Sequence, residues 1–291
     1  MPHPRRPSRR ALLRTLAAGV AIPAGVGFYT WQVEPFWPEF HERPMPIAGL
    51  PAGLAGARVA HLTDLHVASP TSYAYVRGVV RQVNALRPDL VLVTGDLVTH
   101  GQTGWLDRAC DLVAQLKPAV FVSFGNHDYG REALPGGGEV DVAAHLEARL
   151  TRAGHTVLRN RAATWGRGGQ TLRIVGMEDL WSGRFAPATA FSDGEPADTA
   201  RPTIALSHNP DTGVVVDGYR PAWILAGHTH GGQIRIPGYG ALLLPIQQRH
   251  LQKGEFQLAH ARLYVSRGVG FLTRTRFCCR PEVPIFTLQP A

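Results

Sequence analysis

Five short apolar stretches of this chain each lead into side chains that can bind a metal. The clearest is Trp223-Ile224-Leu225-Ala226, which is followed by Gly227-His228-Thr229-His230-Gly231-Gly232-Gln233. Four apolar residues before a glycine indicate a short buried strand that ends in a turn. Side chains at i and i+2 of an extended chain point to the same side, so His228 and His230 can contact one ligand. An isolated His-x-His pair also occurs in loops that bind nothing, so the other four stretches decide between the two interpretations.

The other predicted strands follow the same plan. They lead, in chain order, from Arg58–Thr63 into Asp64-Leu65-His66, from Leu90–Thr94 into Gly95-Asp96, from Ala119–Phe124 into Gly125-Asn126-His127-Asp128, and from Thr203–Ser207 into His208. Apolar residues at helical spacing predict helices between them, at about 72–87, 105–116 and 139–153. Further strands are predicted at 172–176, 262–266 and 283–288, and a surface excursion at 192–202. Alternating strands and helices indicate an α/β fold.

Side chains at the carboxyl ends of the strands in an α/β sheet meet at one edge, where ligands bind. We therefore expect seven donors to converge: Asp64, His66, Asp96, Asn126, His208, His228 and His230. Taken singly, each has an ordinary structural role, because Asp64 could cap a helix and Asp96 or Asn126 could form a turn. Their joint occurrence at successive strand ends is not explained by such roles and predicts a metal site.

Imidazole, carboxylate and amide donors without a cysteine favour divalent ions such as Mn, Fe, Zn, Co or Ni. Seven donors exceed what one open catalytic site uses, but they suit two ions that share a bridging carboxylate. Two ions ~3.5–4 Å apart clamp a phosphate group and generate a nucleophilic hydroxide near neutral pH. The sequence therefore predicts a centre for two divalent metal ions that acts on phosphate esters.

These motifs, in this order and spacing, resemble the full motif set of the calcineurin-like metallophosphoesterases over residues 58–288. The resemblance implies an αββα sandwich of two mixed sheets, with the two metals at the carboxyl ends of the strands. It implies that Asp96 bridges the metals and that His127 is the general acid beside the leaving group. It assigns one metal to Asp64, His66 and His230, and the other to Asn126, His208 and His228.

A narrower resemblance is to an exported or membrane-anchored bacterial branch, carried by residues 227–234, 263–268 and 280–283. Some of its members hydrolyse UDP-2,3-diacylglucosamine or model phosphodiesters, so we expect a small-molecule or lipid-linked phosphodiester or pyrophosphate as substrate. Protein phosphatases of the superfamily carry Asp and Arg shortly after the Gly-Asp motif, whereas this chain has Leu97-Val98-Thr99-His100. This difference argues against a phosphoprotein substrate, and it leaves the orienting partner of His127 open. The alternatives are a soluble cyclic-nucleotide phosphodiesterase and a metal-stabilised binding domain without turnover, which would not need His127.

The N-terminus carries an export pattern. Ser8-Arg9-Arg10 precedes an uncharged stretch at 15–33, which resembles a twin-arginine signal read by the export machinery. The alternative is an arginine-rich tail before an ordinary helix. We expect export, and retention of this stretch as a membrane anchor on the outer face, because it nearly reaches the ~20 residues of a membrane span. Cleavage near Gly19-Val20-Ala21 is the other possibility. The predicted organisation is a signal or anchor at 1–33, an irregular proline-rich connector at 34–56, and one catalytic domain at 57–291.

Composition excludes other classes. The formal net charge is +8, but five arginines lie within the first fourteen residues, so the remainder has an ordinary surface charge and no nucleic-acid-binding face is expected. Cys110, Cys278 and Cys279 match no zinc motif, and adjacent cysteines bridge each other only with strain, so free thiols are expected. We expect a monomer.

Overall fold

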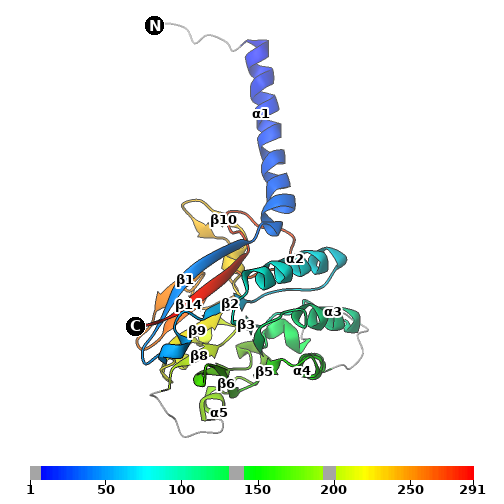
Figure 1. Ribbon diagram of the computed structural model, residues 1–291. Coiled ribbons are helices and arrows are strands. Elements are labelled where there is room, and N and C mark those ends of the chain that lie inside the picture. The colour runs from blue at the N-terminus through cyan, green and yellow to red at the C-terminus, as the bar shows by residue number, and fades with distance from the viewer. Residues whose placement is uncertain (1–7, 131–140, 193–200) are drawn as a thin grey trace.

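The computed structural model describes residues 8–130, 141–192 and 201–291. Two six-stranded mixed sheets form its centre (Figure 1). In spatial order, the first consists of β1 (Glu39–Ile47), β14 (Glu282–Pro290), β2 (Arg58–Leu62), β3 (Leu90–Thr94), β4 (Ala119–Ser123) and β5 (Thr156–Val157). The second consists of β12 (Gly254–Gln257), β13 (Arg262–Val265), β9 (Trp223–Ala226), β8 (Thr203–Leu206), β7 (Gln170–Gly176) and β6 (Arg161–Arg167). A small hairpin of β10 (Arg235–Ile236) and β11 (Gly240–Ala241) lies apart from both sheets.

Side chains that alternate along the strands build three apolar layers. On β3, Leu90 and Leu92 face the second sheet, whereas Val91 and Val93 face the helices. On β9, Trp223 and Leu225 pack into the layer between the sheets, and Ile224 packs into the layer on the outer face. Strands that are buried on both faces are therefore continuously apolar, which is why their sequences show no alternation of polar and apolar residues.

Helices cover both outer faces, so the predicted αββα sandwich is confirmed. The first sheet is covered by α2 (Pro70–Leu86), α3 (Thr103–Val113) and α4 (Val142–Arg152), and the second by the short helices α5 (Pro187–Ser192) and α6 (Gly213–Asp217). Helix α2 starts two residues before its predicted start because Ser69 and Ser72 form a reciprocal capping box. It ends at Leu86, and the next residue, Arg87, takes a left-handed conformation (φ 49°) that terminates the helix. The predicted glycine loop at 136–138 and most of the excursion at 192–202 lie outside the described residues.

The expectation of irregular structure throughout 34–56 is wrong for residues 39–47. Strand β1 pairs in parallel with β14 along its whole length and forms one edge of the first sheet. Pro44 and Pro46 occupy alternate positions, and an edge strand tolerates prolines because one side of it has no partner strand. The prolines led to the prediction of irregular structure, but they are compatible with a strand at the edge of the sheet.

Helix α1 (Arg9–Phe28) extends away from the sheets (Figure 1), and a π-helical turn at Tyr29–Val33 continues it. No helix within the described residues combines the length and apolarity of a membrane span. At the foot of α1, the buried carboxylate of Glu34 accepts the backbone N–H groups of Cys278 and Cys279. This contact ties the foot of α1 to the segment that precedes β14. All three cysteines are free, as expected.

Candidate metal centre

All seven predicted donors lie where strands end, but they come from two sheets. Asp64, His66, Asp96 and Asn126 follow β2, β3 and β4 of the first sheet. His208, His228 and His230 follow β8 and β9 of the second. The expectation of a single sheet edge is therefore wrong, because the adjoining edges of two stacked sheets supply the donors. Donors still converge, since two of the three candidate groups, Asp64 with His66 and His230 and Asp96 with His208 and His228, combine residues of both sheets, and the third consists of His66, Asp96 and His127.

Strained backbone positions these side chains. Five of the predicted donors have a left-handed conformation, with φ of 54° at Asp64, 48° at His66, 53° at Asp96, 68° at His228 and 49° at His230. Residues other than glycine rarely adopt this conformation, and the strain persists only where the surrounding structure imposes it. Such strain clusters at functional sites, so its occurrence here supports a binding function for the strand ends.

Glycines allow the segments that follow the strands to approach each other closely at the site, between the sheets at Gly227 and within the first sheet at Gly125. A Cβ atom on Gly227 would lie 2.2 Å from Thr63 Oγ1 and 2.3 Å from an oxygen of Asp64. A Cβ atom on Gly125 would lie 2.2 Å from Asp96 Oδ1. Both distances are far below any contact that real side chains make, so only glycine fits at either position. The glycines of the Gly-His and Gly-Asn motifs are explained by this close approach.

One group of donors consists of Asp64, His66 and His230, and all three are buried. The Nε2 atoms of His66 and His230 lie 3.0 Å apart. His230 Nε2 is 3.3 Å from Asp64 Oδ1, and His66 Nε2 is 4.0 Å from the same oxygen. The predicted ligand set of the first metal is thus assembled around one point.

The second group consists of Asp96, His208 and His228. A carbonyl oxygen can only accept, so His208 donates from Nδ1 to Thr94 O at 2.6 Å, and His228 donates from Nε2 to Pro245 O at 3.1 Å. The remaining nitrogens, His208 Nε2 and His228 Nδ1, face each other at 3.3 Å. A metal ion between these nitrogens would satisfy the lone pairs of both neutral rings; without one, a proton on His208, which the Asp96 carboxylate favours, takes its place.

Two further atoms fit a metal ligand set. The side-chain oxygen of Asn126 is buried and has no hydrogen-bond partner, as expected for an amide oxygen reserved for a cation. Asp96 Oδ2 lies 3.2 Å from His208 Nε2 and 3.5 Å from His66 Nε2. One carboxylate oxygen therefore faces the histidines of both groups, which is the position that a bridging ligand requires.

Burial and charge determine the protonation of these groups. Burial lowers the pKa of His66 and of His228 to about 3, so both imidazoles are neutral at physiological pH and can act as ligands. Burial also raises the pKa of Asp64 to about 6. Burial opposes the charged form of His208 too, but the carboxylate of Asp96 outweighs it and raises that pKa well above its usual value. The centre of the site therefore attracts positive charge.

Comparison with known proteins agrees with this geometry. A family model described as calcineurin-like phosphoesterase matches residues 57–232. The chain belongs to this family. It is a metal-dependent phosphoester hydrolase, and its two stacked sheets match the fold that the sequence predicts, with metal-competent side chains clustered at the strand ends.

Relatives of this phosphoesterase match almost its full length. It is 31% identical to the phosphodiesterase YaeI of Escherichia coli (strain K12), over 97% of this chain and 99% of that protein. It is 30% identical to the uncharacterized metallophosphoesterase YkuE of Bacillus subtilis (strain 168), over 98% of this chain and 97% of that one. It is 29% identical to the UDP-2,3-diacylglucosamine pyrophosphatase LpxG of Chlamydia trachomatis, over 80% of this chain and 83% of that protein.

His127 of the phosphoesterase lies beside both donor groups. Its backbone N–H donates to Asp96 Oδ1 at 3.0 Å, and its ring stands edge-on to that of His66 with the centroids 5.0 Å apart. Its Nδ1 donates to the backbone oxygen of Thr99 at 3.0 Å. That carbonyl is an orienting partner, which sequence could not reveal because it is a main-chain atom. It fixes the orientation of the ring, because Nδ1 must carry a proton to donate to this carbonyl.

Two residues near the site were missed. Strand β7 leads through Met177 and Glu178 into Asp179, which is 1% exposed and whose Oδ2 has no hydrogen-bond partner. Asp179 Oδ1 accepts the backbone N–H of Trp181 at 2.7 Å, and the ring centroid of Trp181 lies 4.5 Å from that of His228. The signal was available, since a strand was predicted at 172–176 and an acidic pair follows it. The sequence analysis assigned no role to Glu178 and Asp179 because Met177 separates them from the predicted strand.

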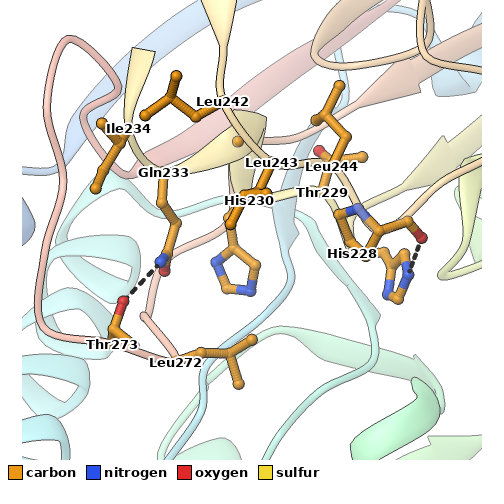
Figure 2. A pocket seen from close by; sticks show the side chains of 12 residues that line it. His228, Thr229, His230, Gln233, Ile234, Leu242, Leu243, Leu244, Leu272 and Thr273 are labelled. Atoms are coloured by element: carbon orange, nitrogen blue, oxygen red, sulfur yellow. Dashed lines mark hydrogen bonds between the residues drawn. The ribbon is translucent and has the colours of Figure 1, made fainter.

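An apolar pocket of about 430 Å³ opens beside His228 and His230. Figure 2 shows His230 between Gln233 and His228, with leucines around them. Gln233 donates to Thr273 Oγ1 at 3.1 Å. The apolar part of the wall consists of Ile234, Leu242, Leu243, Leu244, Pro245 and Leu272.

Proposed function

We propose that this phosphoesterase hydrolyses a phosphodiester or pyrophosphate bond at a centre for two divalent ions, with His127 as general acid. The observation that carries the proposal is the position of Asp96 Oδ2, which faces His208 and His66 at 3.2 and 3.5 Å. Asp64, His66 and His230 would hold one ion. Asn126, His208 and His228 would hold the other, with Asp96 shared. The donor set suits Mn, Fe, Zn, Co or Ni.

When bound, two divalent ions supply Lewis acidity and a nucleophilic water at neutral pH. The chain's own residues do the rest. Burial keeps His66 and His228 neutral, so they remain ligands over the physiological range. The Thr99 carbonyl holds the His127 ring by its Nδ1 proton, and Nε2 of the same ring would donate a proton to the departing oxygen. A metal-stabilised binding domain without turnover would gain nothing from this arrangement.

For the substrate, we propose a lipid-linked or nucleotide-sugar phosphoester such as UDP-2,3-diacylglucosamine. The printed functions of two relatives, a phosphodiesterase and a UDP-2,3-diacylglucosamine pyrophosphatase, support this class. A soluble cyclic-nucleotide phosphodiesterase is the second candidate, and the exposed ring of Trp181 beside His228 would favour it, because aromatic rings stack on bases. We further propose twin-arginine export, residence at the outer face of the cell membrane and a monomeric state.

Leaving groups of different basicity test the acid role of His127. General acid catalysis is worth ~10²–10⁴-fold, and only where the leaving group is basic. The variant His127→Asn should keep its metals and much activity on nitrophenyl diesters, whose leaving group departs without a proton. It should lose far more on alkyl diesters, and less on a nucleotide pyrophosphate, whose leaving phosphate is weakly basic.

The measurement is the slope of log rate against leaving-group pKa in wild type and variant. The exposed His260 provides a matched control, and His260→Asn should leave the slope unchanged. If His127 only orients the substrate or a ligand, the activity of His127→Asn would fall by the same factor for every leaving group. An unchanged slope in that variant would remove His127 from the acid role.

A further inference from the structure

The pocket beside His228 and His230 is built by residues that the metal centre does not use. Gly231 and Gly232 have φ of 62° and 84° and turn the chain back immediately after His230. A Cβ atom on Gly232 would lie 2.3 Å from the Cβ of Ala241, so glycine is required where the β10–β11 hairpin folds over the turn. The Gly-Gly pair of the motif thus places the apolar segment 242–245 next to the metal centre.

The pocket wall combines a few polar groups with a larger apolar part. His228, His230 and the Gln233–Thr273 hydrogen bond supply the polar groups. The side-chain oxygen of Gln233 is buried and has no hydrogen-bond partner, so it can accept from a ligand. Leucines surround these groups (Figure 2). A ligand that carries a phosphate, a polar group and an apolar chain would match this wall.

Several leucines of the pocket wall are exposed although they surround a cavity. Leu243 is 81% exposed, Leu272 47% and Leu242 44%. Ile236 and Tyr239 on the adjoining hairpin are 44% and 76% exposed. Single exposed leucines need no explanation, but a group of them around a pocket at an active site indicates a ligand-binding surface. Nothing within the described residues covers them.

The same wall is tied to the foot of α1. Ile234 forms a β-bridge with Phe277. The backbone N–H of Arg276, which precedes Phe277, donates to Thr30 O at 3.0 Å. The guanidinium of Arg274 lies 4.8 Å from the ring centroid of Trp31. The pocket therefore opens on the part of the molecule from which α1 departs, and Figure 1 shows the β10 hairpin beside the foot of that helix.

From these observations we propose that the pocket is a subsite for an alkyl or acyl chain carried by the phosphoester substrate. The inference rests on the proposed function, because the phosphate of the same molecule must reach the metal centre. The chain lies along Leu242, Leu243 and Leu272, and a hydroxyl or amide of the substrate donates to Gln233. A pocket of about 430 Å³ with apolar walls and few polar groups suits such a ligand.

The test uses p-nitrophenyl alkyl phosphates, from methyl to decyl, with the metal-reconstituted full chain and substrate below micelle-forming concentrations. The leaving group is constant, so the chemistry does not change along the series. Each methylene that enters the pocket should raise kcat/KM about fourfold, which corresponds to ~0.8 kcal/mol per buried CH₂, until the chain extends beyond the pocket. The double variant Leu243→Gln/Leu272→Gln should remove most of this gain, so that its kcat/KM becomes nearly independent of chain length.

Both leucines are largely exposed, so their replacement does not threaten folding. Val215 is 52% exposed on α6 and does not line the pocket, so Val215→Gln is the matched control and should keep the full chain-length dependence. Binding of decyl phosphate and methyl phosphate to metal-free protein, measured by calorimetry, gives a readout independent of turnover. Wild type and Val215→Gln should prefer decyl phosphate, and the double variant should not.

The outcomes separate the two proposals. Hydrolysis of the methyl ester with no gain from longer chains overturns the subsite and leaves the proposed function standing. A gain that survives in the double variant also overturns it, because the chain would then lie elsewhere. Failure to hydrolyse any member of the series, with metals bound, contradicts the proposed function itself. Discrimination between decyl and methyl phosphate by metal-free protein would then still show that the pocket binds an apolar chain.

Discussion

At the scale of single residues, several of them orient the histidines of the site through backbone carbonyl groups rather than through side chains. Thr99 orients His127 through its carbonyl, and Thr94 and Pro245 fix the tautomers of His208 and His228 in the same way. Substitution of these three residues would change the side chain but keep the carbonyl. Residue types in the sequence therefore indicate the candidate metal donors, but they do not indicate the main-chain atoms that orient these donors.

Glu282 provides a residue-scale prediction away from the metal centre. Its carboxylate is 3% exposed and accepts from Arg267, His41 and Tyr264. Burial opposes the charge of Glu282, but the hydrogen bond from His41 and the charge of Arg267 outweigh it and lower the pKa from 4.5 to about 2. A lowered pKa stabilises the fold above the unfolded-state value, and this contribution is lost as pH falls from about 4.5 towards 2.

The shift corresponds to roughly 3 kcal/mol, at ~1.4 kcal/mol per pKa unit. Denaturant unfolding should therefore show Glu282→Gln to be less stable than wild type at pH 6, with the difference narrowing by pH 3. Glu42 pairs with Arg58 but is exposed, so Glu42→Gln should change the stability by less than about 0.5 kcal/mol. A difference between wild type and Glu282→Gln that stays constant from pH 6 to pH 3 would contradict this reasoning.

At the scale of elements, the sequence predicts the strands that are buried on both faces and end at a turn. Strands β2, β3, β4, β8 and β9 are short, mainly apolar runs, and a glycine or a predicted donor follows each within two residues, so their positions could be predicted from the pattern alone. Strand β1 does not follow, because two prolines lie within it and its partner strand among the described residues, β14, is far away in the sequence. Non-local pairing of this kind leaves no local signal.

Sequence patterns do not predict the pocket either. Its wall combines the turn after β9, the irregular segment 242–245 and Leu272, none of which has helical or strand periodicity. Its existence depends on the hairpin folding over Gly232 and on the bridge between Ile234 and Phe277. The glycines of the motif were recognised as sharp turns, but what the turn brings together is determined by contacts between distant segments.

At the scale of the whole molecule, the globular body and α1 pose separate questions. We propose that Arg9 and Arg10 direct export and that residues 15–33 then hold the enzyme at the membrane. Replacing both arginines with lysine should retain the protein inside the cell, although the charge is unchanged, because arginine and lysine differ in hydrogen-bonding geometry. Cell fractionation measures this. Undiminished delivery of the double variant contradicts the export proposal, and release of wild type by salt alone contradicts the anchor.

The central claim is that side chains from the adjoining edges of two sheets hold a pair of divalent ions. Metal analysis of the purified full chain by mass spectrometry, after reconstitution, tests it most directly. About two ions per chain are predicted. Asp96→Asn should lower this number, since both sites lose a shared charge, whereas Cys110→Ala on α3 should not. A reconstituted wild type that holds no metal, yet hydrolyses phosphodiesters fully in the presence of a chelator, would contradict the account.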